Sequence, residues 1–199
     1  MAYAEFDLKK AVDTFGLSTV ERTDLFRNVE PIEPSDFLRV WLDEFAEIAV
    51  GVNSEKARSE FIITPILAEM KRRSVGVINV LPGVTFGVDQ AQGLTGFCDY
   101  LIARSPEVYY VAAPIIAVVE AKKEDLVGGL GQCAAEMVAI QIFNEREGKP
   151  LPAVHGCVTS GSLWRFLRLT GKSLNIDPPE YSLRDAAKIL GILVTIARG

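Results

Sequence analysis

The spacing of hydrophobic residues divides the chain into helical and extended segments. After a short helix and an irregular stretch that ends near Pro34, apolar residues recur at helical intervals in four segments: 35–49, 54–73, 125–147 and 182–197. Runs of β-branched and aromatic residues bounded by glycine, proline or serine predict three strands: 75–80, 97–103 and 115–120. Segments 153–159 and 163–169 flank Ser160-Gly161-Ser162 and predict a hairpin.

This order of elements predicts a single α/β (α+β) unit with a central mixed sheet covered by helices. Within it we expect an acidic helical N-terminal arm over residues 1–52 and a sheet-containing domain over residues 53–199. Pro65 lies inside the second helical segment and is expected to bend it, because proline lacks the N–H that a helix interior needs.

Composition narrows the class of protein. The 199 residues are 49% hydrophobic and 24% charged, which excludes a disordered chain, a collagen and a coiled coil. The three cysteines are scattered, which excludes a disulfide scaffold and favours a reduced, cytoplasmic compartment. We expect no association with a membrane, since no signal peptide is recognisable and the longest apolar runs are far shorter than the roughly 20 residues that span a bilayer.

The net charge of −5 is unevenly distributed. Residues 1–50 hold 5 basic and 11 acidic residues, a balance of −6, whereas residues 51–199 hold 16 and 15, a balance of +1. The acid excess therefore belongs to the N-terminal quarter. The remainder has no basic field that would hold a polyanion without the help of a metal or of specific contacts.

The candidate chemistry lies where two predicted strands end. Side chains alternate along a strand, so Glu120 and Lys122 point to the same face, and Asp99 ends the preceding strand. If the strands are neighbours, the two carboxylates can converge on one hard cation such as Mg²⁺. Lys122 would then lie beside the metal-bound water, an arrangement suited to hydrolysing a phosphodiester.

Asp99 followed by Glu120-Ala121-Lys122, a separation of 120 − 99 = 21 residues, resembles the D…(D/E)-x-K core of the PD-(D/E)XK nuclease superfamily. Over roughly residues 54–170 the chain is similar to one branch, the nuclease domain at the N-terminus of type I restriction motor subunits. Three further elements match that branch: the acidic helix opened by Glu60, Gln132 with Glu136 in the next helix, and the hairpin 154–166. The chain departs from the pattern at Cys98, Glu136 and Ser160, and it contains no G-x-x-x-x-G-K-[ST] loop, so a translocase would be a separate chain.

The resemblance implies a restriction-endonuclease-like fold and a Mg²⁺- or Mn²⁺-dependent nuclease that cleaves DNA in restriction, repair or defence. It implies that Asp99, Glu120 and the Ala121 carbonyl hold the metal and that Lys122 acts on the water or stabilises charge. It further places Glu60, as support for a second metal, and Gln132 in the site. A homodimer is expected by analogy, because cutting a duplex needs two sites, and a protein partner could supply specificity or translocation.

Two other functions stay open. The domain could be a non-catalytic binding or assembly module whose acidic arm contacts a protein partner, or it could hydrolyse a different phosphate ester. His155, Trp164 and Phe166 are interpreted as structural, and the glycines at 128, 129 and 131 as sites of close packing against the sheet.

Overall fold

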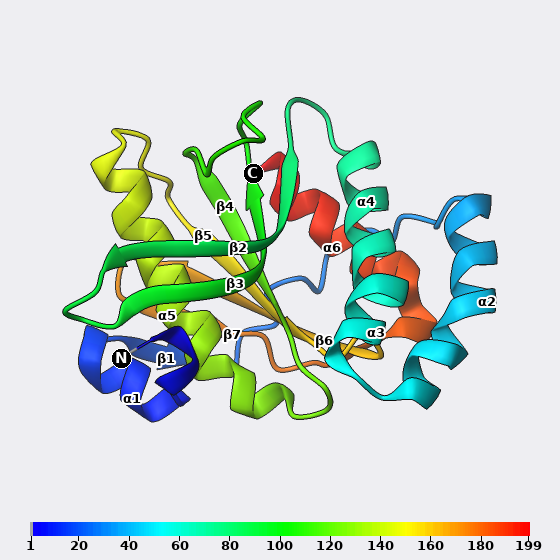
Figure 1. Cartoon of the computed structure of the whole chain (residues 1–199), viewed down its shortest axis with the longest axis horizontal. Coiled ribbons are helices and arrows are strands. Elements are labelled where there is room, and N and C mark those ends of the chain that lie inside the picture. Colours follow the sequence, from blue (N-terminus) through cyan, green and yellow to red (C-terminus); the bar gives the residue numbers. More distant parts are fainter. Residues whose placement is uncertain (1) are drawn as a thin grey trace.

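The computed structural model describes residues 2–199, which form a mixed sheet between two layers of helices (Figure 1). The order across the eight-stranded sheet is β1-β7-β6-β5-β4-β3-β2, and β8 pairs with β6. Pairs β4–β5 and β1–β7 are parallel and the other pairs are antiparallel. The predicted α/β class, with helices covering a mixed sheet, is confirmed. The strands are β1 (Ser18–Val20), β2 (Asn79–Asp89), β3 (Leu94–Ala103), β4 (Ile115–Ala121), β5 (Val154–Thr159), β6 (Leu163–Thr170), β7 (Ser173–Ile176) and β8 (Tyr181–Ser182).

The helices divide between the two faces of the sheet. One core joins α5 and the N-terminal elements to one face, and the other core joins α2, α4 and α6 to the opposite face. The helices are η1 (Tyr3–Glu5), α1 (Leu8–Phe15), α2 (Asp36–Val52), α3 (Glu55–Arg58), the π-helical turn η2 (Ser59–Ile63), α4 (Thr64–Arg73), α5 (Leu126–Arg146), η3 (Leu183–Asp185) and α6 (Ala186–Arg198). By length and hydropathy α5 could also cross a membrane, but 67% of its apolar window is buried within the fold, as in the core helix of a globular domain.

The N-terminal quarter is built into both cores. Tyr3 and Phe15 lie in the core beneath α5, Leu38 of α2 lies in the other, and β1 forms an edge of the sheet. The backbone at Asp7 lies very close to α5, because a Cβ at Gly131 of that helix would be 2.1 Å from the carbonyl carbon of Asp7. Only glycine fits there, which supports the interpretation that glycines in this helix serve close packing.

The first predicted strand, 75–80, is misplaced. Residues 75–78 precede the sheet, and β2 runs from Asn79 to Asp89 as one arm of a long hairpin with β3. Pro82, Gly83 and Gly87 hide this strand in the sequence because proline and glycine normally interrupt strands. Here Gly83 adopts a positive φ of 63°, a conformation open to glycine, and the pairing register with β3 is the same on both sides of it.

The helical segment predicted over 54–73 is continuous but changes its winding before Pro65. Ser54 caps it, and the π-helical turn η2 separates α3 from α4. Because Pro65 has no N–H, the carbonyl of Phe61 lacks its usual helical donor. The indole of Trp41 in α2 donates to that carbonyl at 3.0 Å, so the interruption becomes the docking point between two helices.

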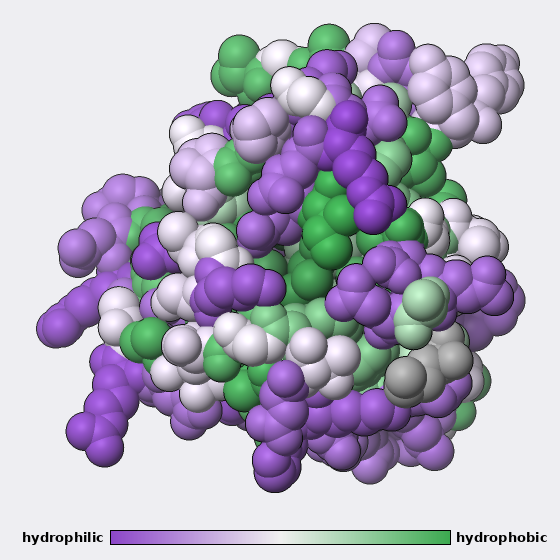
Figure 2. All heavy atoms as spheres, turned by 90° about the vertical axis from the view of Figure 1, so that its left-hand side faces the viewer, coloured by the Kyte–Doolittle hydropathy of each residue, from purple (hydrophilic) through white to green (hydrophobic). Residues whose placement is uncertain are grey.

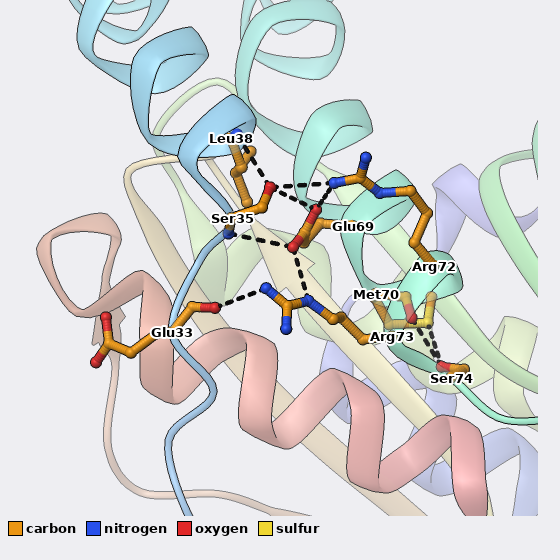
Figure 3. A network of polar contacts seen from close by, with 8 residues as sticks. All are labelled: Glu33, Ser35, Leu38, Glu69, Met70, Arg72, Arg73 and Ser74. Atoms are coloured by element: carbon orange, nitrogen blue, oxygen red, sulfur yellow. Dashed lines mark hydrogen bonds and ion pairs between the residues drawn. The ribbon is translucent and has the colours of Figure 1, made fainter.

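A buried carboxylate fixes the start of α2 against α4 (Figure 3). Glu69 is 2% exposed and forms ion pairs with Arg72 and Arg73, and it accepts hydrogen bonds from the backbone N–H and hydroxyl of Ser35. Ser35 caps α2 by accepting from the Leu38 N–H. Burial alone would raise the pKa of Glu69, but the arginines and Ser35 outweigh it and lower the pKa to about 2.

Candidate active site

Strands β3 and β4 place the two predicted carboxylates beside each other. The antiparallel register pairs Tyr100 with Val119, so one step further along the strands Asp99 comes opposite Glu120. Asp99 Oδ2 accepts a 2.8 Å hydrogen bond from the backbone N–H of Ala121. The expectation that the strands bearing Asp99 and Glu120 are neighbours is confirmed.

The lysine of the motif links this strand end to α5. Lys122 Nζ donates to Glu120 Oε1 at 2.7 Å and to Gln132 Oε1 at 3.0 Å. Gln132 Nε2 in turn donates to Glu136 Oε1 at 3.1 Å. A chain of four side chains therefore runs from the end of β4 to the middle of α5, and it includes the Gln132 that the sequence singled out.

The sequence between β4 and α5 makes this chain of contacts feasible. Asp125 caps α5 by accepting from the Gly128 N–H, which starts the helix directly after the strand. A Cβ at Gly129 would lie 2.6 Å from the Val158 side chain and 3.1 Å from the Lys122 methylenes. The absent side chain lets α5 lie close to the sheet and leaves room for the stem of Lys122.

Burial controls the ionisation of this group of side chains. Glu120 is 2% exposed, and burial, reinforced by the neighbouring Asp99 charge, raises its pKa to about 7 despite the nearby Lys122. Burial also raises the pKa of Asp99, and it raises that of the fully enclosed Glu136 well above its usual range. Burial alone would lower the pKa of Lys122, but the attraction of Glu120 is stronger, and the net effect is a raised pKa. The amine is therefore an ammonium at neutral pH.

The carboxylate oxygens are compatible with a cation. Glu120 Oε2 is buried and, among residues 2–199, has no hydrogen-bond partner, so it remains available as a ligand. The same residues contain no group of three or more His, Cys, Asp or Glu side chains arranged to hold a metal. A Mg²⁺ ion would therefore depend on Asp99, Glu120, the Ala121 carbonyl and water, a set of oxygen ligands that this ion accepts.

A cavity of about 480 Å³ opens on the Asp99 side of this group. Asp99, Ala121 and Glu60 line it, so the third predicted acidic residue reaches the site. Its carboxylate is engaged by Lys56 at 2.6 Å and is half-exposed, so Glu60 lies at the margin of the cavity. The structure adds Glu55, which lines the same cavity and raises the pKa of both Asp99 and Glu120.

Sequence reasoning missed Glu55 because it read this residue only as part of a helix start. Its position could have pointed to the site, because Glu55 directly follows the Ser54 cap and is separated from Glu60 by about one turn that runs into the π-helical η2. A π-helical turn adds a residue and changes which side chains share a face, and periodicity of 3.6 residues does not reveal it.

Trp164, Phe166 and His155, interpreted as structural from the sequence, lie inside the fold. Trp164 and Phe166 are fully buried, and the Trp164 indole donates to the Gly161 carbonyl at 2.9 Å. His155 is the second residue of β5 and lies near the Phe26 ring, and burial lowers its pKa to about 4.

Neither the models of known protein families nor the curated proteins and solved structures contain a match to this chain.

Proposed function

We propose that this protein is a metal-dependent nuclease with a restriction-endonuclease-like domain, acting on DNA phosphodiester bonds. One observation carries the proposal: Asp99 and Glu120 lie opposite each other on adjacent strands, and the Lys122 ammonium is held between Glu120 and Gln132. These charges are half-buried or buried at a strand end, where burial lowers stability, and charged groups kept at such a cost are characteristic of functional sites.

Different residues of the site would bind the metal and stabilise charge during the reaction. Asp99, Glu120 and the Ala121 carbonyl would hold Mg²⁺ or Mn²⁺, which supplies neutralisation of phosphate charge and a water of lowered pKa. In the metal-free protein Glu120 holds Lys122 as an ammonium. That charge can act on the attacking water or stabilise the negative charge that develops on the phosphate, and Gln132 fixes its direction.

Glu136 supports this arrangement from the interior. It is completely buried, and its Oε1 accepts from the amide of Gln132. That bond orients the amide so that its oxygen faces Lys122, which makes Gln132 and Glu136 positioning residues rather than groups that touch the substrate.

A binding or assembly module is the second candidate. The observation that favours it is the charge of the cavity, where Glu55, Glu60 and Asp99 face one lysine, Lys56. Such a cavity repels a polyanion unless a cation is bound. A separate chain that supplies specificity or translocation, or a second copy of this chain, would fit either function.

The test compares Lys122→Ala and Glu120→Gln with wild type on linear and supercoiled DNA in the presence of Mn²⁺. Both variants should lose at least about 10²-fold of the cleavage rate, the size of effect expected from a positioned charged group. The matched control is Lys123→Ala, which removes the exposed neighbouring lysine and should cleave like wild type. Equal activity in all four proteins would indicate a contaminant, and no activity in any of them on DNA or RNA would favour the binding module.

A further inference from the structure

Three exposed aromatic rings lie around strand β2, and one of them, Phe97, lines the cavity of the candidate active site. Phe97 on β3 is 58% exposed, and Tyr109 and Tyr110 on the loop between β3 and β4 are 98% and 64% exposed. Large aromatic side chains usually bury their faces, so three such rings on one part of the surface call for a ligand.

The rings line two neighbouring cavities, which together make up a path across β2. Phe97 lines the cavity that contains Asp99, and Tyr109 and Tyr110 line a second cavity of about 410 Å³. Both cavities include Gly83 of β2 in their walls. A Cβ on Gly83 would lie 3.2 Å from the Phe97 ring, so the ring rests against this glycine and joins the two cavities.

The path runs over the outer face of the β2–β3 hairpin. Thr85, which lines the second cavity, pairs with Phe97 across the hairpin, so their side chains share a face. Both are exposed, whereas the opposite face of the hairpin packs into the core beneath α5. Figure 1 shows β2 and β3 in front of the molecule with no helix over them, and Figure 2, which views the molecule from the left-hand side of Figure 1, shows hydrophobic residues exposed between hydrophilic ones.

From this geometry we infer that Phe97, Tyr109 and Tyr110 form a stacking platform for the bases of an unpaired nucleic-acid strand whose backbone enters the Asp99 cavity. The inference rests on the proposed nuclease function and specifies its substrate: a single strand, or a duplex with an unpaired end. Aromatic rings accept the faces of unpaired bases, whereas paired bases in a duplex have their faces covered by their neighbours.

Charge supports this choice of ligand over a duplex held by its phosphates. The wall of the tyrosine cavity, residues 81, 83–85 and 108–111, contains no charged side chain. The Asp99 cavity has three carboxylates and one lysine in its wall. Little of the affinity can therefore come from phosphate contacts, and stacking has to supply the rest.

The test measures binding separately from cleavage. Fluorescence anisotropy is recorded with a labelled single strand of about 16 nucleotides, the upper end of the site sizes of single-strand-binding folds, and with the matching duplex. The protein carries Lys122→Ala, in Mg²⁺, so that the probe stays intact. The single strand should bind more tightly than the duplex, and Phe97→Ala or the pair Tyr109→Ala/Tyr110→Ala should weaken its binding about 5- to 150-fold per stacked base.

Two controls address the role of the rings. Tyr109→Phe/Tyr110→Phe keeps the rings and should bind as the parent does. Phe37→Ala removes an equally exposed ring on α2, away from the path, and should have no effect. Two binding results would overturn the platform: equal binding by the ring variants and the parent, or no binding to any strand. A change in sedimentation mass on loss of the rings would also overturn it, because the rings would then form a contact between copies of the chain.

Failure of the platform and failure of the nuclease can be told apart. Ring-dependent binding of the single strand with no cleavage by the Lys122-containing protein in Mg²⁺ or Mn²⁺ would reject the nuclease and keep the platform. Metal-dependent cleavage that the ring variants retain in full would reject the platform and keep the nuclease.

Discussion

Replacing Glu120 by glutamine should make the metal-free protein more stable at alkaline pH, although it removes a proposed catalytic group. Glu120 is buried, and its pKa rises from an ordinary value of 4.5 to about 7. The folded state therefore holds the proton that the unfolded chain releases first. Stability should fall as pH rises from about 4.5 to about 7 and stay low above that range.

The size of the effect follows from this shift. At about 1.4 kcal/mol per pKa unit, ionised Glu120 lowers the free energy of unfolding at pH 8 by about 3 kcal/mol. Glutamine has the same shape and no charge to bury, and the pKa of about 7 already includes the attraction of Lys122 to the ionised carboxylate. We therefore expect a net gain of about 3 kcal/mol at pH 8 and of less than about 1 kcal/mol at pH 5.

The assay is urea unfolding in EDTA at both pH values, with Glu44→Gln as the control because Glu44 is an exposed glutamate of α2. Adding millimolar Mg²⁺ should stabilise wild type, since binding to the folded state shifts the equilibrium, and should not stabilise Glu120→Gln. A variant that is less stable than wild type at both pH values would refute the reasoning, because the carboxylate would then stabilise the fold.

Further outcomes concern the packing of the N-terminal elements. Glu69→Gln should lower stability by about 1–2 kcal/mol at pH 7, less than the shift to a pKa of about 2 implies because Arg72 and Arg73 are 57% and 40% exposed. This difference should disappear in urea titrations as pH falls from about 4.5 to 2, since the lowered pKa stabilises the fold only while Glu69 is ionised. Gly131→Ala should cost about 1–3 kcal/mol in thermal or urea unfolding through its clash with Asp7, whereas Gly51→Ala, with nothing within 4 Å, should be neutral or stabilising.

Local patterns predicted the parts of the fold that depend on local chemistry. The hairpin of β5 and β6, the extent of α5 and the end of α4 at Arg73 agree with hydrophobic spacing and with glycine and proline signals. The pairing of Asp99 with Glu120 could be expected because two apolar strands separated by a short connection commonly lie side by side.

Non-local contacts explain what the sequence did not reveal. β1 has three residues and is held by parallel pairing with the distant β7, and β7 has four residues and lies between β1 and β6, so neither is long enough to show a pattern of its own. Strand β2 was concealed by Pro82 and Gly83, and Glu55 by the π-helical turn that follows it. Tyr109 and Tyr110 line a cavity together with Gly83 of β2, and the sequence of the loop alone does not predict that contact.

The pairing of β1 with β7 also affects how the protein folds during its synthesis. Ser18 lies opposite Ser173, so 173 − 18 = 155 residues separate the two partners along the chain. At typical elongation rates of about 5–20 residues per second, Ser18 waits roughly 8–30 s on the ribosome before Ser173 is made. Tyr3 and Phe6, which pack beneath α5, stay unburied until that helix has also emerged. The N-terminal segment should therefore be among the last elements to acquire protection from hydrogen exchange.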